Sequence, residues 1–214
     1  MSEKYPRIYH VPFSPGTTSD DRLLASVDHL YNKDLVITEK CDGGNACLDP
    51  TGVYARTHGS TANHPSFDHL KATWSTVKSD IPEGWAIYGE NMMAKHSIAY
   101  TSLPALFLVF GVLTDTKEWL SWADVKIVAE SLNLKTVPEL WAGRITSQEG
   151  LQQIVESLLA EGSQCGGEAI EGIVVRAAGR FSGFDTSIAK YVRKGHVKTS
   201  EHWMLQAIVP NKLR

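Results

Sequence analysis

Lys40 is the residue whose surroundings most suggest chemistry. Residues 36–45 read VITEKCDGGN, so Lys40 ends an apolar run and is followed by an aspartate, two glycines and an asparagine. A lysine at a strand end often serves only to protect an exposed sheet edge. The alternative is a nucleophile, whose amine must be unprotonated, and burial or a neighbouring cation favours this state by lowering its pKa. Gly43 and Gly44 would then let the backbone turn sharply beside a ligand.

Five further stretches place polar or aromatic residues in or beside expected strands. They are ARTHG at 55–59, IYGE at 87–90, LFLVFG at 106–111, EGIVVR at 171–176 and AKYVRK at 189–194. Each has an ordinary interpretation, because most glutamates are exposed and a phenylalanine in an apolar strand is usually core. Lys-x-Asp-Gly alone also recurs by chance. The presence of all six stretches, in this order, favours a single active site.

Together the six stretches resemble the covalent nucleotidyltransferase superfamily, which comprises ATP-dependent ligases and RNA capping enzymes. The resemblance extends from about residue 36 to residue 194. Asn45 and the stretch GENMMAKHSIAY at 89–100 are similar to RNA ligases, especially bacteriophage RNA ligases of the second type. The resemblance implies a nucleotidyltransferase (ATP-grasp-like ligase) adenylation domain. In it, Lys40 would attack the α-phosphorus of ATP, release pyrophosphate and retain AMP as a phosphoramidate.

The resemblance also implies the contacts to the nucleoside. Glu39 is expected to help recognise adenine, and Glu90 to hydrogen-bond the ribose hydroxyls. Phe110 and Val174 are expected to pack on the two faces of the base. Phe107 is the alternative to Phe110, because both lie in the same apolar stretch.

Phosphate and metal contacts follow from the last two stretches. Glu171 is expected to hold Mg²⁺, or Mn²⁺ in its place, because such a cation takes oxygen ligands and needs few of them from the protein. Lys190 is expected to be catalytic and to contact phosphate. The superfamily usually has Lys-x-Lys here, but Val192 occupies the second position. Lys194 is therefore the alternative nucleotide contact, and Arg193 a contact to the RNA end.

Contacts to RNA are expected at two further places. By resemblance, Asn45 engages the substrate end. Arg56 is expected at the α-phosphate or the RNA 5′-phosphate, which its planar donors suit. The basic stretch KYVRKGHVK at 190–198 would follow a phosphate backbone, although a solvated edge strand has a similar composition.

These residues predict an ATP-dependent RNA ligase that joins 5′-phosphate and 3′-hydroxyl RNA ends in RNA repair. A DNA ligase, a GTP-dependent capping-type enzyme and a non-catalytic nucleic-acid-binding relative are the alternatives. DNA ligases and capping enzymes usually carry an OB-fold after the basic strand, whereas 20 residues follow Lys194 here. We therefore expect one adenylation domain over residues 1–214, without an accessory domain. An accessory RNA-binding protein is an expected partner.

Composition fits one soluble α/β-type domain. The chain has 214 residues, 43% of them hydrophobic and 21% charged, and its net charge of -3 gives no overall basic field. Three cysteines without a CxxC pair argue against structural disulfides or a zinc site. The N-terminus lacks an apolar signal core, and the longest apolar run is too short to span a membrane. We expect a cytoplasmic protein without membrane contact.

The expected fold class is α+β, with largely antiparallel sheets flanked by helices, because strands and helices do not alternate regularly. The expected strands are 34–39, 45–48, 53–56, 85–89, 106–113, 169–176 and 188–192. The expected helices are 20–31, one after Pro65, 117–133, 146–159 and 199–208.

Overall fold

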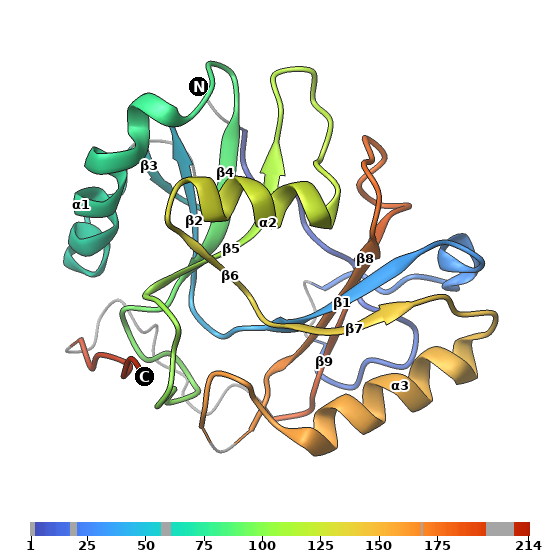
Figure 1. Cartoon of the computed structure of the whole chain (residues 1–214). Helices are drawn as coiled ribbons and strands as arrows, with labels where there is room; N and C mark the ends of the chain where they lie inside the picture. Colours follow the sequence, from blue (N-terminus) through green and yellow to red (C-terminus); the bar gives the residue numbers. More distant parts are fainter. Residues whose placement is uncertain (1–2, 18–20, 57–60, 168, 196–207) are drawn as a thin grey trace.

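The computed structural model describes residues 3–17, 21–56, 61–167, 169–195 and 208–214 (Figure 1). The helices are α1 (Asp68–Val77), α2 (Trp122–Ser131) and α3 (Gln148–Glu161), with the short 3-10 helices η1 (Asp28–Leu30), η2 (Pro65–Phe67) and η3 (Lys78–Asp80). The strands are β1 (Leu35–Lys40), β2 (Gly44–Asp49), β3 (Gly52–Ala55), β4 (Ala86–Asn91), β5 (Phe107–Leu113), β6 (Lys135–Thr136), β7 (Glu139–Gly143), β8 (Gly172–Ala177) and β9 (Ile188–Val192).

In the described part of the chain the strands form two sheets. One has the order β7-β1-β8-β9 and the other the order β3-β2-β4-β5-β6. Every strand pair is antiparallel except β5–β6, so the expected α+β class with largely antiparallel sheets is confirmed. The chain passes from the first sheet to the second between β1 and β2. The chain therefore crosses between the sheets in the turn after Lys40, and it crosses back between β6 and β7.

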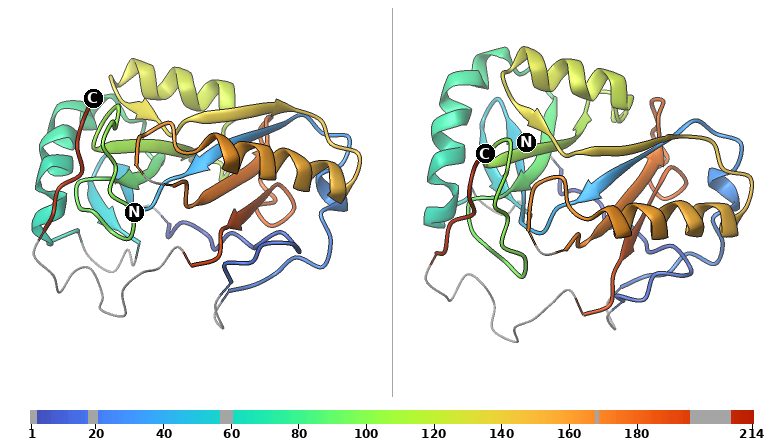
Figure 2. Two further views of the ribbon diagram at one scale, coloured as in Figure 1. Left: turned by 90° about the horizontal axis from the view of Figure 1, so that it is seen from below. Right: turned by 60° about the horizontal axis from the view of Figure 1, so that its bottom comes forward.

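The helices cover the outer faces of the two sheets. Helices α1 and α2 pack with the five-stranded sheet, and α3 packs against the four-stranded one (Figure 2). Helix α3 shows how sequence produces this: Leu151, Val155 and Leu158 form one buried stripe at helical spacing. Ser147 caps its start by accepting from the Gly150 N–H at 3.1 Å, and Gly162 follows its end with a φ of 81°.

The helix expected over residues 20–31 is wrong. The described residues 21–27 are not helical, and only η1 forms a short turn. Backbone pairing with the N-terminal segment explains the difference. The His10 N–H donates to the Arg22 carbonyl, and the Leu24 N–H donates to the His10 carbonyl, each at 2.8 Å. These long-range bonds replace those that a helix would make within itself.

Helix α2 is shorter than expected, since the sequence predicts a start at residue 117. It begins at Trp122, because Ser121 accepts from the Asp124 N–H at 3.1 Å and Lys117 has a φ of 62°, which no helix accommodates. Strands β6 and β7 were not predicted. Of the helix expected over 199–208, residues 199–207 lie outside the described residues, and Ile208 is not helical.

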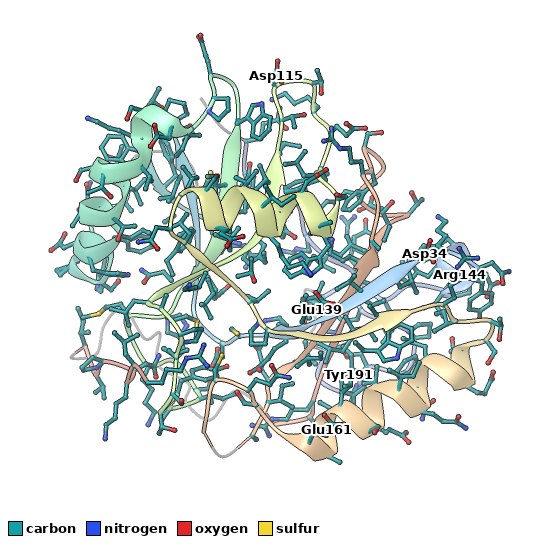
Figure 3. All side chains as sticks on the ribbon, in the orientation of Figure 1. Asp34, Asp115, Glu139, Arg144, Glu161 and Tyr191 are labelled. Atoms are coloured by element: carbon teal, nitrogen blue, oxygen red, sulfur yellow. The ribbon has the colours of Figure 1, made fainter. Side chains whose placement is uncertain are left out.

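Strand β7 helps to hold the two sheets together (Figure 3). The Glu139 carboxylate accepts from the Trp122 indole N–H and from the Lys126 ammonium, both at 2.7 Å, and both donors lie on α2. At the other end of β7, Arg144 pairs with Asp34 at 2.6 Å. An edge strand of one sheet is thus fastened to a helix of the other. Within the described residues, no helix is long and apolar enough to cross a membrane.

Candidate active site

A cavity of about 460 Å³ lies between the two sheets. The four-stranded sheet, the five-stranded sheet and the N-terminal segment all contribute to its walls. From the sheets and their ends the lining includes Thr38, Glu39, Lys40, Val174, Arg176, Ile188 and Lys190 on one side, and Gly43, Asn45, Arg56, Glu90 and Phe110 on the other.

Lys40 lines this cavity from the end of β1. Leu35 and Ile37 point into the core shared with α3, and alternation along the strand turns Lys40 to the opposite side. Its ammonium donates to Glu171 Oε1 at 2.7 Å. Lys40 lies opposite Gly172 of β8, where any Cβ would collide with the Tyr191 carbonyl oxygen. Glycine at this position lets β9 approach closely behind the Lys40–Glu171 pair.

The carboxylates around Lys40 govern its protonation. Burial alone would lower the pKa of Lys40, but the carboxylates of Glu171 and Glu90 outweigh burial and raise it well above its ordinary value. Burial, aided by the charge of Glu171, raises the pKa of Glu90 to about 8 against the opposing effect of Lys40. At neutral pH Lys40 is therefore an ammonium and Glu90 is mostly protonated. The expectation that the pKa of Lys40 is lowered is therefore wrong, because the neighbouring carboxylates of the protein raise it.

Asn45 and Glu90 occupy facing positions on β2 and β4. Gly43 permits this arrangement, because a Cβ there would lie 2.7 Å from the Asn91 carbonyl oxygen and 2.9 Å from Glu90 Cγ. Asn45 Oδ1 is buried without a hydrogen-bond partner among the described residues. A buried acceptor of this kind is available to a donor from a ligand.

The Glu39 carboxylate is fixed at the opposite side of β1. It accepts from Ser163 Oγ at 2.5 Å and from the Gln164 N–H at 3.0 Å, in the loop after α3. Burial raises the pKa of Glu39 although these hydrogen bonds lower it. Phe110 and Val174 line the cavity from opposite sheets, whereas Phe107 is 4% exposed in the core.

The wall around Phe110 is supported by two residues that were not among the site residues expected from the sequence. Arg176 is buried and donates to the carbonyls of Phe110, at 3.0 Å, and Leu120, at 2.8 Å. Burial lowers its pKa to about 10, so it stays charged at neutral pH. Tyr5 packs edge-on against Phe110 with ring centroids 4.9 Å apart. Arg176 was detectable, since it lies two places after Val174 on the same strand face; nothing local marked Tyr5.

The basic residues divide into two groups. Lys190 and Arg56 line the cavity, but Arg193 and Lys194 are not part of its lining. Arg193 instead donates to the Ile170 carbonyl at 2.8 Å. The second cavity-facing position on β9 is Ile188, two residues before Lys190, so the structure places no second lysine of the motif there. Residues 196–198 of the basic stretch lie outside the described residues.

Among the described residues, two sets of side chains have the chemistry to hold a cation. Glu171 and Glu90, which both act on the pKa of Lys40, offer oxygen ligands suited to Mg²⁺ or Mn²⁺. The other set is Glu39, Cys41 and Cys165, whose ligand atoms lie within 4.8 Å of one another. A hydrogen bond with Cys165, together with burial, raises the pKa of Cys41 well above its ordinary value. Since metals bind the thiolate, the raised pKa of Cys41 disfavours a metal at this second set.

A family model described as RNA ligase matches residues 33–192. The chain belongs to the RNA ligase family. The resemblance inferred from the six sequence stretches is thereby confirmed, and the match contains Lys40, Glu90, Glu171 and Lys190.

Solved structures of RNA ligases share the fold of this family member. An archaeal ATP-dependent RNA ligase (form 1) is similar with a TM-score of 0.58 and 16% identity, over 90% of this chain and 48% of that one. A Naegleria gruberi RNA ligase with PPi gives 0.51 and 17%, over 78% and 51%. This chain therefore spans about half the length of these ligases. Among curated proteins, none shows a significant sequence match.

Proposed function

We propose that this chain is the adenylation core of an ATP-dependent RNA ligase that works through lysyl-AMP on Lys40. The observation that carries the proposal is the Lys40–Glu171 pair at 2.7 Å, whose lysine lines the cavity together with Glu90. A lysine placed at a strand end beside two carboxylates is poised for nucleophilic attack once it loses its proton. Membership of the RNA ligase family supports the same chemistry.

In the first step, the Lys40 amine attacks the α-phosphorus of ATP. A nitrogen–phosphorus bond forms, the bond from the α-phosphorus to the bridging oxygen breaks, and pyrophosphate leaves. Lys40 must first lose its proton to water and give up its ion pair with Glu171, because an ammonium has no free electron pair. Lys190 and Arg56, both in the cavity lining, would balance the phosphate charge.

The carboxylates suit a divalent cation. Glu171 and Glu90 both lie beside the single ammonium of Lys40, which leaves an excess of acidic oxygens when both are ionised. Held mainly by Glu171, Mg²⁺ or Mn²⁺ would supply positive charge against the α-phosphate and the leaving pyrophosphate. A Naegleria gruberi RNA ligase variant with this fold was solved with ATP and Mn, which supports the proposal.

The base contacts favour ATP over GTP. The Glu39 carboxylate only accepts hydrogen bonds when ionised, so it suits the exocyclic amine of adenine better than the carbonyl oxygen of guanine. Phe110 and Val174 would enclose the base, and Glu90 would accept from the ribose hydroxyls. In the later steps, Asn45 and Arg56 would engage the 5′-phosphorylated RNA end that receives AMP. Attack by a 3′-hydroxyl would then join the ends and release AMP.

The test is incubation with ATP labelled at the α-phosphate, followed by denaturation and detection of label on the protein. Wild-type protein should be labelled and Lys40→Ala should not. Lys71→Ala, on the exposed face of α1, is the matched control and should be labelled like wild type. Labelling by GTP alone would instead favour a capping-type enzyme. Absence of label on folded protein that carries no bound AMP would overturn the proposal.

The substrate is tested by the second transfer. Labelled protein is mixed with 5′-phosphorylated RNA or with DNA of the same sequence. We expect AMP on the RNA 5′ end and, with a 3′-hydroxyl partner, a joined strand. Transfer to DNA alone would favour the DNA ligase alternative.

A further inference from the structure

The N-terminal segment lies outside the region matched by the family model, yet it belongs to the cavity. The matched region begins at residue 33, whereas residues 5–8 line the cavity. Residues 9–16 run along β9, the edge strand of its sheet (Figure 1). The Lys190 N–H donates to the Tyr9 carbonyl at 2.9 Å, and the Val11 N–H donates to the Lys190 carbonyl at 2.8 Å. The segment thus pairs with β9 at Lys190, which lines the cavity.

A chain of side chains leads from this segment to the Lys190 ammonium. Ser14 Oγ lies 2.8 Å from His10 Nδ1, and His10 Nε2 lies 3.1 Å from Asp21 Oδ1. The same Asp21 oxygen lies 3.1 Å from Lys190 Nζ. His10 is only 1% exposed, and the side chains of Asp21 and Lys190 are 20% and 17% exposed. The contact between Asp21 and Lys190 is therefore largely shielded from water.

One protonation pattern satisfies every contact in this chain. Burial, aided by the charge of Lys190, lowers the pKa of His10, so its ring is neutral near pH 7. A neutral ring with its proton on Nε2 sets that N–H beside the Asp21 carboxylate, 3.1 Å away, and accepts from the Ser14 hydroxyl at Nδ1. The opposite tautomer would set a bare nitrogen against the carboxylate. His10 thus orients Asp21, and Asp21 orients Lys190.

We propose that His10 and Asp21 are positioning residues that hold the Lys190 ammonium toward the phosphates of the nucleotide. The inference rests on the proposed function, because it concerns the same site. Asp21 restricts the long Lys190 side chain to the conformations that keep its ion pair, and so removes freedom that substrate binding would otherwise have to restrict. In this chain β9 contributes only Ile188 and Lys190 to the cavity lining. Lys190 is therefore the cation of β9 that has to be positioned.

The first test couples Asp21 to Lys190. The rate of Lys40 labelling and the KM for ATP are measured for wild type, Asp21→Asn, Lys190→Ala and the double variant. We expect Asp21→Asn to lower the rate about tenfold with a smaller effect on KM, because misplacing a phosphate-binding group costs more in the transition state than in binding. In the Lys190→Ala background Asp21→Asn should change little, since both act on one interaction. The same tenfold loss in both backgrounds would overturn the proposal.

The second test separates the two contacts of His10. The His10→Gln amide nitrogen can replace Nε2 and keep the bond to Asp21, whereas His10→Asn places its amide near Nδ1 and keeps only the bond to Ser14. A positioning role predicts nearly normal labelling in His10→Gln and a loss in His10→Asn. If the segment matters only because Ser14 fastens it to β9, the order is reversed and the proposal fails.

A binding measurement keeps the inference independent of turnover. AMP affinity is measured by calorimetry for the same Asp21 and Lys190 variants, after circular dichroism has shown that each is folded. The Asp21→Asn effect on AMP affinity should vanish in the Lys190→Ala background. If wild-type protein binds AMP but takes no label from ATP, the proposed function fails while this coupling still decides the inference. Equal effects of Asp21→Asn in both backgrounds would reject the inference alone.

Discussion

Lys40 Nζ lies 2.7 Å from Glu171 Oε1, so the candidate nucleophile is paired with the candidate metal ligand. The two residues are 131 positions apart and meet because β1 and β8 are antiparallel neighbours. Glu171 is buried, and Lys40 keeps 27% of its side chain exposed. The pair helps to keep Lys40 protonated, since the carboxylates of Glu171, Glu90 and Asp42 together outweigh the effect of burial on the lysine pKa. Attack on ATP therefore requires the pair to separate.

Glu171→Gln should lower the pKa of Lys40, because it removes the carboxylate that most strongly opposes the effect of burial on that pKa. The pH dependence of Lys40 acetylation by acetic anhydride, followed by mass spectrometry, measures this, with exposed Lys71 as the internal control in each sample. Adenylylation should nevertheless fall by about 100-fold or more, ~2.7 kcal/mol, through loss of the metal-binding carboxylate. An unchanged acetylation profile for Lys40 would show that Glu171 does not control its protonation.

Glu90 should make the stability of the protein fall as the pH rises. Its pKa is raised from 4.5 to about 8, first by burial. Protonated Glu90 therefore contributes its full stability below about pH 4.5, and this contribution is lost as the pH rises through about 8. At pH 9, Glu90→Gln should have a higher unfolding temperature than wild type. At pH 5 this difference in unfolding temperature should be smaller by about 4 °C or more. For a protein of this length, ~1 kcal/mol corresponds to about 2–4 °C.

The control for this pH series is Glu83→Gln, which removes one carboxylate from an exposed turn. Thermal unfolding of all three proteins is followed from pH 5 to pH 9 without nucleotide. A gap between Glu90→Gln and wild type that stays constant over this range would mean that Glu90 does not titrate there.

Local signals were sufficient for the residues at strand ends. Lys40, Glu90 and Glu171 each follow or precede a short apolar run, and in the fold Lys40 and Glu90 line one cavity while Glu171 pairs with Lys40. The protonation of Lys40 was not readable in this way, because it depends on a carboxylate that only the fold brings near. Spacing reveals which residue types a site contains but not which charges meet in it.

The N-terminal segment shows the same limit for secondary structure. Leu23, Leu24, Val27 and Leu30 have helical spacing, and yet His10 pairs with Leu23 in the folded chain. Pairing between residues 13 positions apart leaves no periodic signal. The Asp21–Lys190 contact, across 169 positions, was hidden for the same reason.

Arg176 should be a main support of the wall that carries Phe110. Arg176→Met leaves the carbonyls of Phe110 and Leu120 without their donor, which should lower the free energy of unfolding by about 3 kcal/mol. Arg180→Met is the matched control, because Arg180 is 52% exposed and pairs with Asp124 at the surface, where solvent screens the ion pair and its loss should change stability little. Urea unfolding measures both. Equal losses in the two variants would show that the buried contacts add nothing.

Gly172 should be needed for the close approach of β8 and β9. In Gly172→Ala the new methyl group meets the Tyr191 carbonyl oxygen, and relieving the clash must separate Lys190 on β9 from Glu171 beside β8. We expect a loss of about 1–3 kcal/mol in urea unfolding, typical of overpacking. Labelling by ATP should fall further than stability explains when measured on fully folded protein. Gly179→Ala adds the same methyl group where no atom lies within 4 Å and should change stability by about 0.5 kcal/mol or less. If the two alanine variants match in stability and labelling, the tight strand pair does not position the site.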